Sequence, residues 1–450
     1  MLAAGDRGTE FGGGRNVPLS SRVTDAPTSS RSRVLAWALW DCGATGLNAV
    51  VGTFVFSVYL TGQVGVGLPG TATPASWLGK ALTVAGLVVA LLAPATGILV
   101  DAPRRRRPAL VLLTGLVVAM TAAMSLIDAD YHYLLPGLIL LACTAACSDL
   151  ATVPYNAVLG QLSTPKNIGR VSGIGSAAGF FGSVLLLLIL YAGFIAGDGD
   201  TRGLLGLEAA HGQNIRVAML FAAAWLAMFA FPLLFLVRPP PARDSGPAVG
   251  FVGAYRALWH EVKNEWRRDH NVVYYLLASA VFRDGLTGIF AFGAVLGVSV
   301  YGVSQADVLI FGVCVSIVAA VGAVSGGVLA DRVGPKPVIT CSLAAMIAVG
   351  LVLLSGSGPL LFWICGLALC LFVGPILAAA RALMLRLSGP GKEGVAFGLY
   401  TTTGRAASFL APWMFFTFVD LFGADRAGMG GLCVVLAAGL LAMLAVRVPR

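Results

Sequence analysis

The stretch GVLADRVGPK, at residues 327–336, is a short polar interval between two long apolar runs. A related stretch, GILVDAPRR, stands at residues 97–105 and also separates two apolar runs. In each stretch a glycine is followed four positions later by an aspartate, and basic residues come after it. A pattern that returns at this distance indicates that the chain consists of two related halves.

The first apolar run of each half carries a second shared pattern. Residues 41–46 read DCGATG and residues 284–288 read DGLTG. Each run then ends in Ser-Val-Tyr, at residues 57–59 and 299–301. Two parallel repeats that enclose a central site are the plan of many secondary transporters.

Apolar runs long enough to cross a membrane fill most of the chain. A hydrocarbon core about 30 Å thick needs about 20 apolar residues in one helix. We therefore predict an all-α membrane protein with twelve transmembrane helices in two pseudo-symmetric six-helix bundles. The predicted helices cover residues 34–60, 78–100, 108–127, 133–160, 168–196, 214–237, 272–300, 305–330, 336–354, 359–385, 394–421 and 426–446.

The composition argues against the soluble classes of protein. Of the 450 residues, 58% are apolar and only 11% are charged, whereas a soluble domain has about 25% charged residues. The 8 cysteines all lie in apolar runs, which favours buried thiols over disulfides or metal ligands. We expect no metal, no cofactor and no enzymatic activity, because the sequence shows neither a Walker loop nor a catalytic triad pattern.

The basic residues indicate how the chain crosses the membrane. Most of the 30 Lys and Arg residues fall in connectors on one side, and this bias places that side in the cytoplasm. Since they are scattered among short connectors, they do not form a nucleic-acid footprint. The opposite side holds Lys80, Arg202, Arg216 and Arg426. Both chain ends are therefore predicted to be cytoplasmic.

Four regions follow from these assignments. They are a disordered cytoplasmic tail over residues 1–33, an N-terminal six-helix bundle over 34–237, a cytoplasmic linker over 238–271 and a C-terminal six-helix bundle over 272–446. Within the linker, apolar residues at helical spacing oppose basic ones. This pattern favours an amphipathic helix on the anionic cytoplasmic leaflet, with an ordinary polar linker as the alternative.

The stretch at 327–336 resembles the GxLaDRxGrk signature of the major facilitator superfamily, at the place where that family has it. The resemblance implies the superfamily fold and an activity in transport. An acid at one helix end, with basic residues beyond it, can hold the ends of neighbouring helices together in one state and release them in another. The alternative is topology alone, because basic loops are expected on this side. The predicted cytoplasmic gating residues are Asp101, Arg104, Arg105, Gly327, Asp331, Arg332 and Lys336.

Further motifs between residues 35 and 445 look like the branch of the superfamily named for the fungal vacuole effluxer of autophagy. They include WALWD at 37–41, PYNA at 154–157, RDG at 283–285 and GRAASF at 404–409. Eukaryotic members of that branch are associated with returning amino acids from the vacuole to the cytosol, and most bacterial members have no assigned substrate. The resemblance thus implies an amino-acid-like cargo.

Away from the ends of the predicted helices we select five charged residues, namely Asp41, Asp149, Arg283, Asp284 and Arg405. A charge within a bilayer costs about 3 kcal/mol or more unless it is paired or hydrated, so each is a candidate for function. Polar residues continue the same helix faces. The predicted residues of the substrate cavity or of proton coupling are Asp41, Thr45, Asn48, Asp149, Tyr155, Asn156, Arg283, Asp284, Thr287 and Arg405.

These charges support two hypotheses. Because desolvation disfavours a charged carboxylate, Asp41 or Asp149 could gain and lose a proton as the cavity alternates. Arg283 or Arg405 would then hold an anionic group of the cargo or neutralise the acids. The alternative is a static buried ion pair, such as Arg405 with Asp284, that only fixes helix packing.

A fifth-helix segment contains regularly spaced glycines, including Gly169 and Gly173, which predict close small-residue packing against another helix. Taken with the charges, the sequence predicts a secondary active transporter that moves a small organic solute by alternating access, coupled to protons or sodium. We expect a monomer in the plasma membrane of a bacterium. The alternatives are an exporter of amphiphilic or drug-like compounds, and a non-transporting receptor or scaffold on the same fold.

Overall fold

The computed structural model describes residues 31–69, 73–197, 199–236, 263, 270–389 and 391–447. The first 30 residues of the predicted tail lie outside these ranges, whereas Arg31 to Arg33 already belong to the first helix. The predicted amphipathic helix of the linker lies outside them as well, except for Lys263.

The helices before the linker form the N-terminal bundle. They are α1 (Arg31–Ala49), α2 (Phe56–Tyr59), α3 (Pro74–Asp101), α4 (Pro103–Ala123), α5 (Leu134–Leu162), α6 (Ile168–Leu190) and α7 (Gln213–Phe231). Wider π turns at Val50–Phe54, Leu60–Val64, Tyr191–Ile195 and Pro232–Leu236 continue four of these helices. A short hairpin of β1 (Thr201–Arg202) and β2 (Leu207–Glu208) joins α6 to α7.

The helices after the linker form the C-terminal bundle. They are α9 (Asn271–Ser299), α10 (Gln305–Val333), α11 (Pro335–Ser355), α12 (Pro359–Leu387), α13 (Glu393–Ala407), α14 (Leu410–Phe422) and α15 (Ala427–Ala445). Prolines at the first position begin α11 and α12, where the fixed φ of proline suits a helix and its missing N–H is not needed. The glycine before each, Gly334 and Gly358, has a positive φ of 95° and 100°.

One predicted helix, over residues 394–421, is divided. It forms α13 and α14, which are separated by a turn at Ser408 and Phe409. Pro412 explains the break, because it has no N–H to donate to the carbonyl of Ser408 and its ring crowds that carbonyl. In the described part of the chain, 11 other helical segments are long and apolar enough to cross a membrane. With the divided segment, the predicted twelve-segment fold is confirmed.

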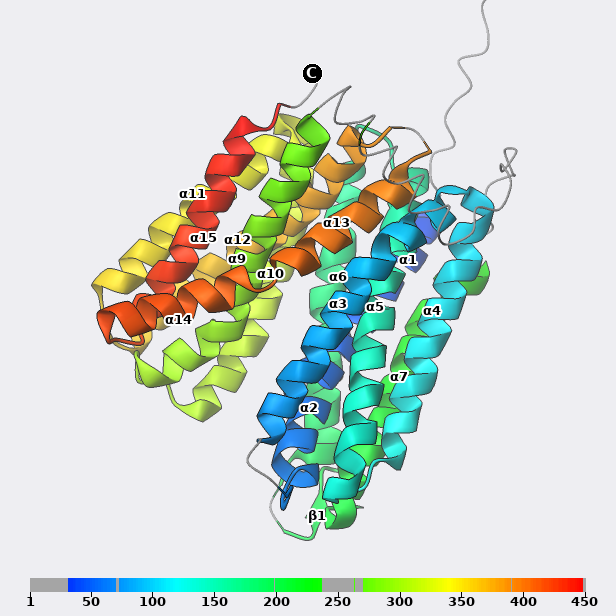
Figure 1. The fold of residues 1–450 in the computed structure, drawn as a ribbon, viewed down its shortest axis with the longest axis vertical. Coiled ribbons are helices and arrows are strands. Elements are labelled where there is room, and N and C mark those ends of the chain that lie inside the picture. The colour runs from blue at the N-terminus through cyan, green and yellow to red at the C-terminus, as the bar shows by residue number, and fades with distance from the viewer. Residues whose placement is uncertain are drawn as a thin grey trace, which may run out of the picture.

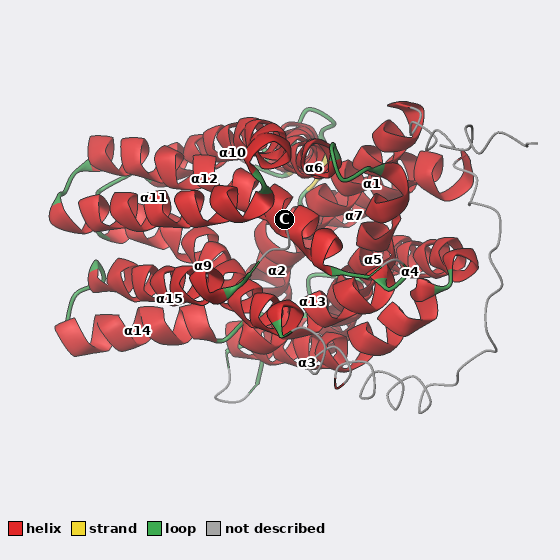
Figure 2. Ribbon diagram, turned by 90° about the horizontal axis from the view of Figure 1, so that it is seen from above, coloured by secondary structure: helices red, strands yellow, loops and turns green. Residues whose placement is uncertain are grey.

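The two bundles meet at one end of the molecule and diverge towards the other (Figure 1). We call the end where they meet the basic end, because Arg104 to Arg107 lie there, at the start of α4. Seen from above, α6, α10 and α13 lie at the boundary between the bundles (Figure 2). The main contacts between bundles are made by α6 with α10 and by α3 with α13. Each pair is a crossing that closes the basic end. We call the crossing of α3 with α13 the first crossing and that of α6 with α10 the second crossing.

Apolar packing holds each bundle together and also faces lipid. Trp37 and Phe56 are fully buried in the N-terminal bundle, as are Tyr275 and Phe282 in the C-terminal bundle. Large apolar side chains such as Leu91 remain exposed on the outside. Lipid tails are as apolar as leucine, so a membrane accepts this surface where water would not.

Candidate functional site

The first charged pair between the bundles joins Asp41 of α1 to Arg381 of α12. Their side chains are 3.5 Å apart and are only 16% and 13% exposed. The Thr45 hydroxyl donates a hydrogen bond of 3.1 Å to the Asp41 carboxylate. Arg381 also donates to the carbonyl of Ser172, at 3.1 Å, and to the hydroxyl of Ser176. An acid of one bundle is thus paired with a base of the other.

Sequence reasoning missed Arg381, because we counted it with the basic connector that follows its helix. The signal was present, since residue 381 falls inside the predicted helix 359–385. In the structure it lies well before the end of α12 at Leu387. It is therefore a sixth charge within the transmembrane helices, and it pairs with Asp41.

The second charged pair between the bundles joins Asp149 of α5 to Arg405 of α13. It again connects the two bundles, and it is more accessible than the first pair, with side chains 22% and 40% exposed. The alternative pairing of Arg405 with Asp284 does not occur. The carboxylate of Asp284 is only 5% exposed and instead accepts the backbone N–H of Ala411 at 2.5 Å, because it faces the start of α14.

Arg283 of α9 lies over an aromatic ring rather than against an acid. Its guanidinium carbon is 3.8 Å from the centre of the Tyr400 ring, and it donates a 2.9 Å hydrogen bond to the Tyr400 carbonyl. The hydroxyl of Thr287 donates to the Arg283 carbonyl at 3.1 Å and stays exposed. The face of a tyrosine ring attracts a cation, which stabilises Arg283 without neutralising it.

An aromatic stack adjoins the Asp41 pair. The Tyr155 ring lies between Trp37, at 4.6 Å, and Trp40, at 4.3 Å. Within the described residues, the side-chain oxygen of Asn156 is buried without a hydrogen-bond partner, whereas the Tyr155 hydroxyl faces the Asp41–Arg381 pair. Unsatisfied buried polar atoms are rare and mark places where a water, ion or substrate group can bind. Asn48, which we also predicted for the cavity, is exposed.

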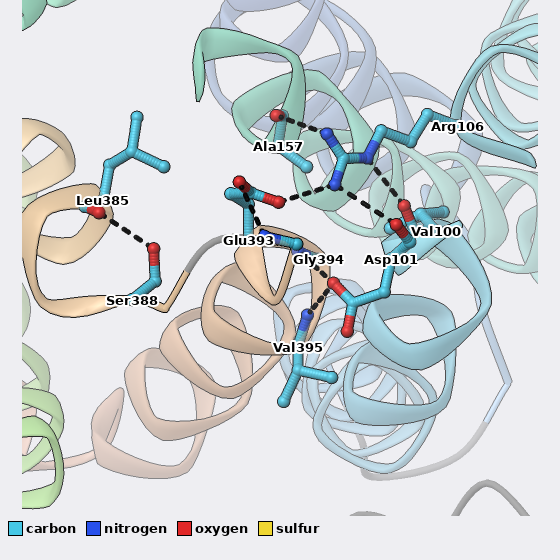
Figure 3. A network of polar contacts seen from close by, with 10 residues as sticks. Val100, Asp101, Arg106, Ala157, Leu385, Ser388, Glu393, Gly394 and Val395 are labelled. Carbon is cyan, nitrogen blue, oxygen red and sulfur yellow. Dashed lines mark hydrogen bonds and ion pairs between the residues drawn. The ribbon is translucent and has the colours of Figure 1, made fainter. Parts of the chain in front are cut away.

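At the first crossing, Asp101 at the end of α3 caps the start of α13. Its carboxylate accepts the backbone N–H groups of Gly394, at 2.7 Å, and Val395, at 3.1 Å (Figure 3). The first N–H groups of a helix have no partner inside it and carry a partial positive charge, so a carboxylate stabilises them.

A buried ion pair strengthens the first crossing. Arg106 is 3% exposed and donates at 2.7 Å to the carboxylate of Glu393, the first residue of α13 (Figure 3). The same guanidinium also bonds the carbonyls of Val100, Asp101 and Ala157. All of its donors are therefore directed at α3, α5 or α13, and it ties the two bundles together.

The second crossing repeats the capping contact in the other direction. Asp331, near the end of α10, accepts the N–H groups of Gly169, at 2.7 Å, and Arg170, at 2.9 Å. Both N–H groups belong to the first turn of α6. Each signature aspartate thus caps a helix of the opposite bundle, and the two halves of the molecule are related in this contact.

Glycines make both crossings possible. A Cβ atom on Gly97 would come within 2.5 Å of the Gly394 carbonyl oxygen, and one on Gly327 within 2.4 Å of the Gly169 carbonyl oxygen. Any side chain there would separate the helices and stretch the capping bonds. Gly173 also packs against Gly327, which is the small-residue packing expected of this helix.

The basic residues predicted for the gate occupy other places. Arg104 and Arg332 are exposed, and Arg105 is only partly buried. Lys336 donates to the carbonyls of Leu444 and Val446 at the end of α15, within its own bundle. Arg106, which sequence reasoning passed over in a run of four arginines, is the one that enters the crossing, because its position on the first turn of α4 points it inward.

Charged pairs join two bundles of apolar helices, and both capped crossings lie at the basic end. The sequence model of the Major Facilitator Superfamily matches residues 42–412, and the chain belongs to this superfamily. It is a transporter and not an enzyme.

Relatives agree with this assignment. The uncharacterized MFS-type transporter YxiO of Bacillus subtilis (strain 168) is 22% identical over 405 residues, covering 90% of this chain and 92% of YxiO. Autophagy-related protein 22 of Cryptococcus neoformans var. neoformans serotype D (strain B-3501A) is 27% identical over 355 residues, covering 70% of this chain and 61% of that protein. The chain thus spans about three fifths of the fungal protein's length. The resemblance to the autophagy-related branch is confirmed.

Solved structures show the same fold. The transporter FucP in the outward conformation superposes with a TM-score of 0.68 at 17% identity, covering 93% of this chain and 100% of FucP. The proton:xylose symporter XylE gives a TM-score of 0.70 at 15% identity, covering 92% of this chain and 94% of XylE. At such low identity these similarities establish the fold alone.

Proposed function

We propose that this transporter moves a small organic solute by antiport or symport with protons. The observation that carries this proposal is the pairing of two acids, each with a base of the opposite bundle, Asp41 with Arg381 and Asp149 with Arg405. Alternating access separates the bundles at the end where they now meet, so each pair must then be pulled apart.

Protonation lowers the cost of that separation. Removing one partner of a buried ion pair costs about 3–5 kcal/mol, because the other charge is left without compensation. A proton on Asp41 or Asp149 removes the negative charge of that pair and, with it, the attraction that opposes opening. Proton binding and bundle movement are coupled in this way, with sodium as the alternative ion that the acids could bind.

The orientation of the molecule follows from its basic end. We assign this end to the cytoplasm, since basic connectors are retained there. The structure then represents an outward-facing state, closed by the crossings of α3 with α13 and of α6 with α10. A single chain contains both bundles and both ion pairs, so we assign a monomer. We place it in the plasma membrane.

The charges also favour a polar cargo over an amphiphilic one. Arg283 hydrogen-bonds a neutral carbonyl and lies over the Tyr400 ring, so it can receive the anionic group of a solute. The unsatisfied Asn156 oxygen can receive a second polar group. An amino-acid-like solute carries such groups, and it is also the cargo that the resemblance to the autophagy-related branch implies.

The test uses the full chain in proteoliposomes. A thermal-shift screen of a metabolite library at two pH values selects solutes, because a bound cargo stabilises the folded protein. Uptake of each selected solute is then measured with and without an imposed proton gradient. We expect Asp41→Asn and Asp149→Asn to lose gradient-driven accumulation while keeping downhill exchange.

The exposed Asp420 of α14 provides the matched control, and Asp420→Asn should behave as the wild type. Gradient-driven accumulation that persists in the Asp41→Asn, Asp149→Asn double variant would contradict proton coupling through these acids. A chain that moves no solute from the library would contradict the transport of small organic solutes.

A further inference from the structure

The divided helix α13–α14 separates two different sets of contacts. The half α13 packs against α3 and α5 of the N-terminal bundle, as well as against α9. The half α14 packs mainly against α15 and α9, which both belong to the C-terminal bundle. The break at Ser408 and Phe409 thus falls where the segment stops bridging the bundles and starts belonging to one of them.

The half that bridges the bundles carries the residues that must move. Glu393 and Gly394, at its first turn, form the first crossing. Arg405, at its last turn, pairs with Asp149. All three residues lie on one continuous helix, α13, whereas α14 makes none of these contacts.

Both halves of the break need their end groups satisfied. At the end of α13 the Arg405 carbonyl accepts both the backbone N–H of Ser408, at 3.3 Å, and its hydroxyl, at 2.8 Å. At the start of α14 no side chain of the helix itself caps the free N–H groups. The carboxylate of Asp284, from α9, accepts the Ala411 N–H instead.

The approach of α9 to α14 is built for this contact. A Cβ atom on Gly288, one turn beyond Asp284, would lie 2.7 Å from the Cβ of Ala411 and 2.7 Å from a methyl of Leu432. Glycine therefore allows the start of α14 to come within hydrogen-bonding distance of Asp284. On the same helix, the neighbouring Arg283 binds the Tyr400 carbonyl of α13.

We propose that Asp284 is a positioning residue for transport, which anchors α14 to the C-terminal bundle, keeps the helix broken at Ser408–Phe409, and so sets Arg405 opposite Asp149. Arg283 and Asp284, which are adjacent residues of α9, then hold the two halves of the segment. Arg283 binds α13, and Asp284 binds α14. The break serves as the hinge about which α13 turns. This inference rests on the proposed transport function for its consequence, but the anchoring contact can be measured without transport.

The first experiment measures amide hydrogen exchange in the peptide that spans the break and the start of α14, in the full-length protein. Loss of a hydrogen bond to a charged group changes an equilibrium by about tenfold or more. Asp284→Ala should therefore raise exchange there about tenfold. Asp284→Asn keeps an oxygen that accepts the same N–H, and its exchange should stay within about twofold of the wild type.

The second experiment measures solute turnover and KM for the same variants in proteoliposomes. Asp284→Ala should lower the turnover about tenfold with a smaller effect on KM, because it displaces Arg405 rather than the cargo. Gly288→Ala keeps every charge but pushes Ala411 away, and it should reproduce both the faster exchange and the lower turnover. Asp420→Asn, on the exposed face of α14, is the matched control and should change neither quantity.

The outcomes separate the anchoring role from the alternatives. If Asp284→Asn is as defective as Asp284→Ala, the residue acts through its ionisation, as a proton carrier would, and the positioning role is refuted. Unchanged exchange and turnover in Gly288→Ala would refute it too, and this variant also decides the case if Asp284→Ala does not fold. If the wild type moves no solute while exchange responds as expected, the transport proposal fails and the anchor stands.

Discussion

The two crossings share one contact and differ in another. In both, an aspartate at the end of one helix caps the first turn of a helix in the other bundle, Asp101 on α13 and Asp331 on α6. The first crossing adds an ion pair from the basic run of its own signature, between Arg106 and Glu393. On the α6 side, Arg381 of α12 pairs with Asp41 and bonds Ser172 and Ser176. At the second crossing the nearest basic residue of the signature, Arg332, is exposed. The ion pair at one crossing thus comes from the basic run of its own signature, and the one beside the other crossing comes from a helix outside the signature.

This difference has a physical consequence for closure of the basic end. When a crossing that contains a buried ion pair opens, each of the two charges loses the partner that neutralised it. A capping carboxylate alone can instead be solvated by the water that enters. We therefore expect the loss of the Arg106–Glu393 pair to weaken closure of the basic end more than the loss of either cap.

Replacement of the buried arginine should have the largest effect. Arg106→Ala leaves Glu393 and several carbonyls without their donor, which we expect to destabilise the closed state by about 3–5 kcal/mol. The basic end should then open, as measured by the reactivity of a cysteine introduced between the bundles. The neighbouring exposed residue gives the control, Arg104→Ala, which should leave that reactivity unchanged. Equal effects of the two variants would contradict the distinct role of Arg106.

Loss of the first cap should come next. Asp101→Ala removes a carboxylate whose single oxygen Oδ1 accepts both backbone N–H groups, and the loss of this charged acceptor costs about 1.5–3 kcal/mol. We expect greater accessibility of the basic end and a lower midpoint of thermal unfolding. Asp101→Asn should recover part of both, since the amide oxygen still accepts. The ranking would be wrong if Asp101→Ala had a larger effect than Arg106→Ala.

A methyl group added at the glycine contact of either crossing should lower stability by pushing the two helices apart, without removing any charge. Gly327→Ala places a Cβ against the Gly169 carbonyl, and overpacking of this kind costs about 1–3 kcal/mol. Gly97→Ala does the same at the first crossing, against Gly394. Thermal unfolding of the two variants should show similar losses, because the geometry is similar. A loss confined to one of them would show that the crossings are not related in their packing.

The exposed signature residue should matter least. Arg332→Ala removes a charge that lies outside the second crossing, and we expect no measurable change in thermal stability or in accessibility of the basic end. The informative comparison is with Asp331→Ala, which removes the cap on α6 and should increase accessibility. A strong effect of Arg332→Ala on the closed state would restore the gating role that the sequence suggested for it.

The sequence predicted the repeats, the transmembrane segments and both signature aspartates. It could not select Arg106 from four consecutive arginines, because helix rotation decides which of them points between the bundles. The break in the segment 394–421 was missed although Pro412 was visible, since prolines within long membrane helices, such as Pro94 and Pro154, need not divide them. Tertiary packing decides whether the groups freed by a proline find new partners.

The sequence by itself determined that the chain lies in lipid and consists of two related halves, because hydropathy, length and repeated motifs are local properties. The tertiary structure decided which charges meet. Asp41 pairs with Arg381, Asp149 with Arg405, and Asp284 caps α14. Each contact joins helices that are far apart in the chain. Which side chains meet depends on how each helix is rotated about its axis, and the packing of the two bundles sets that rotation.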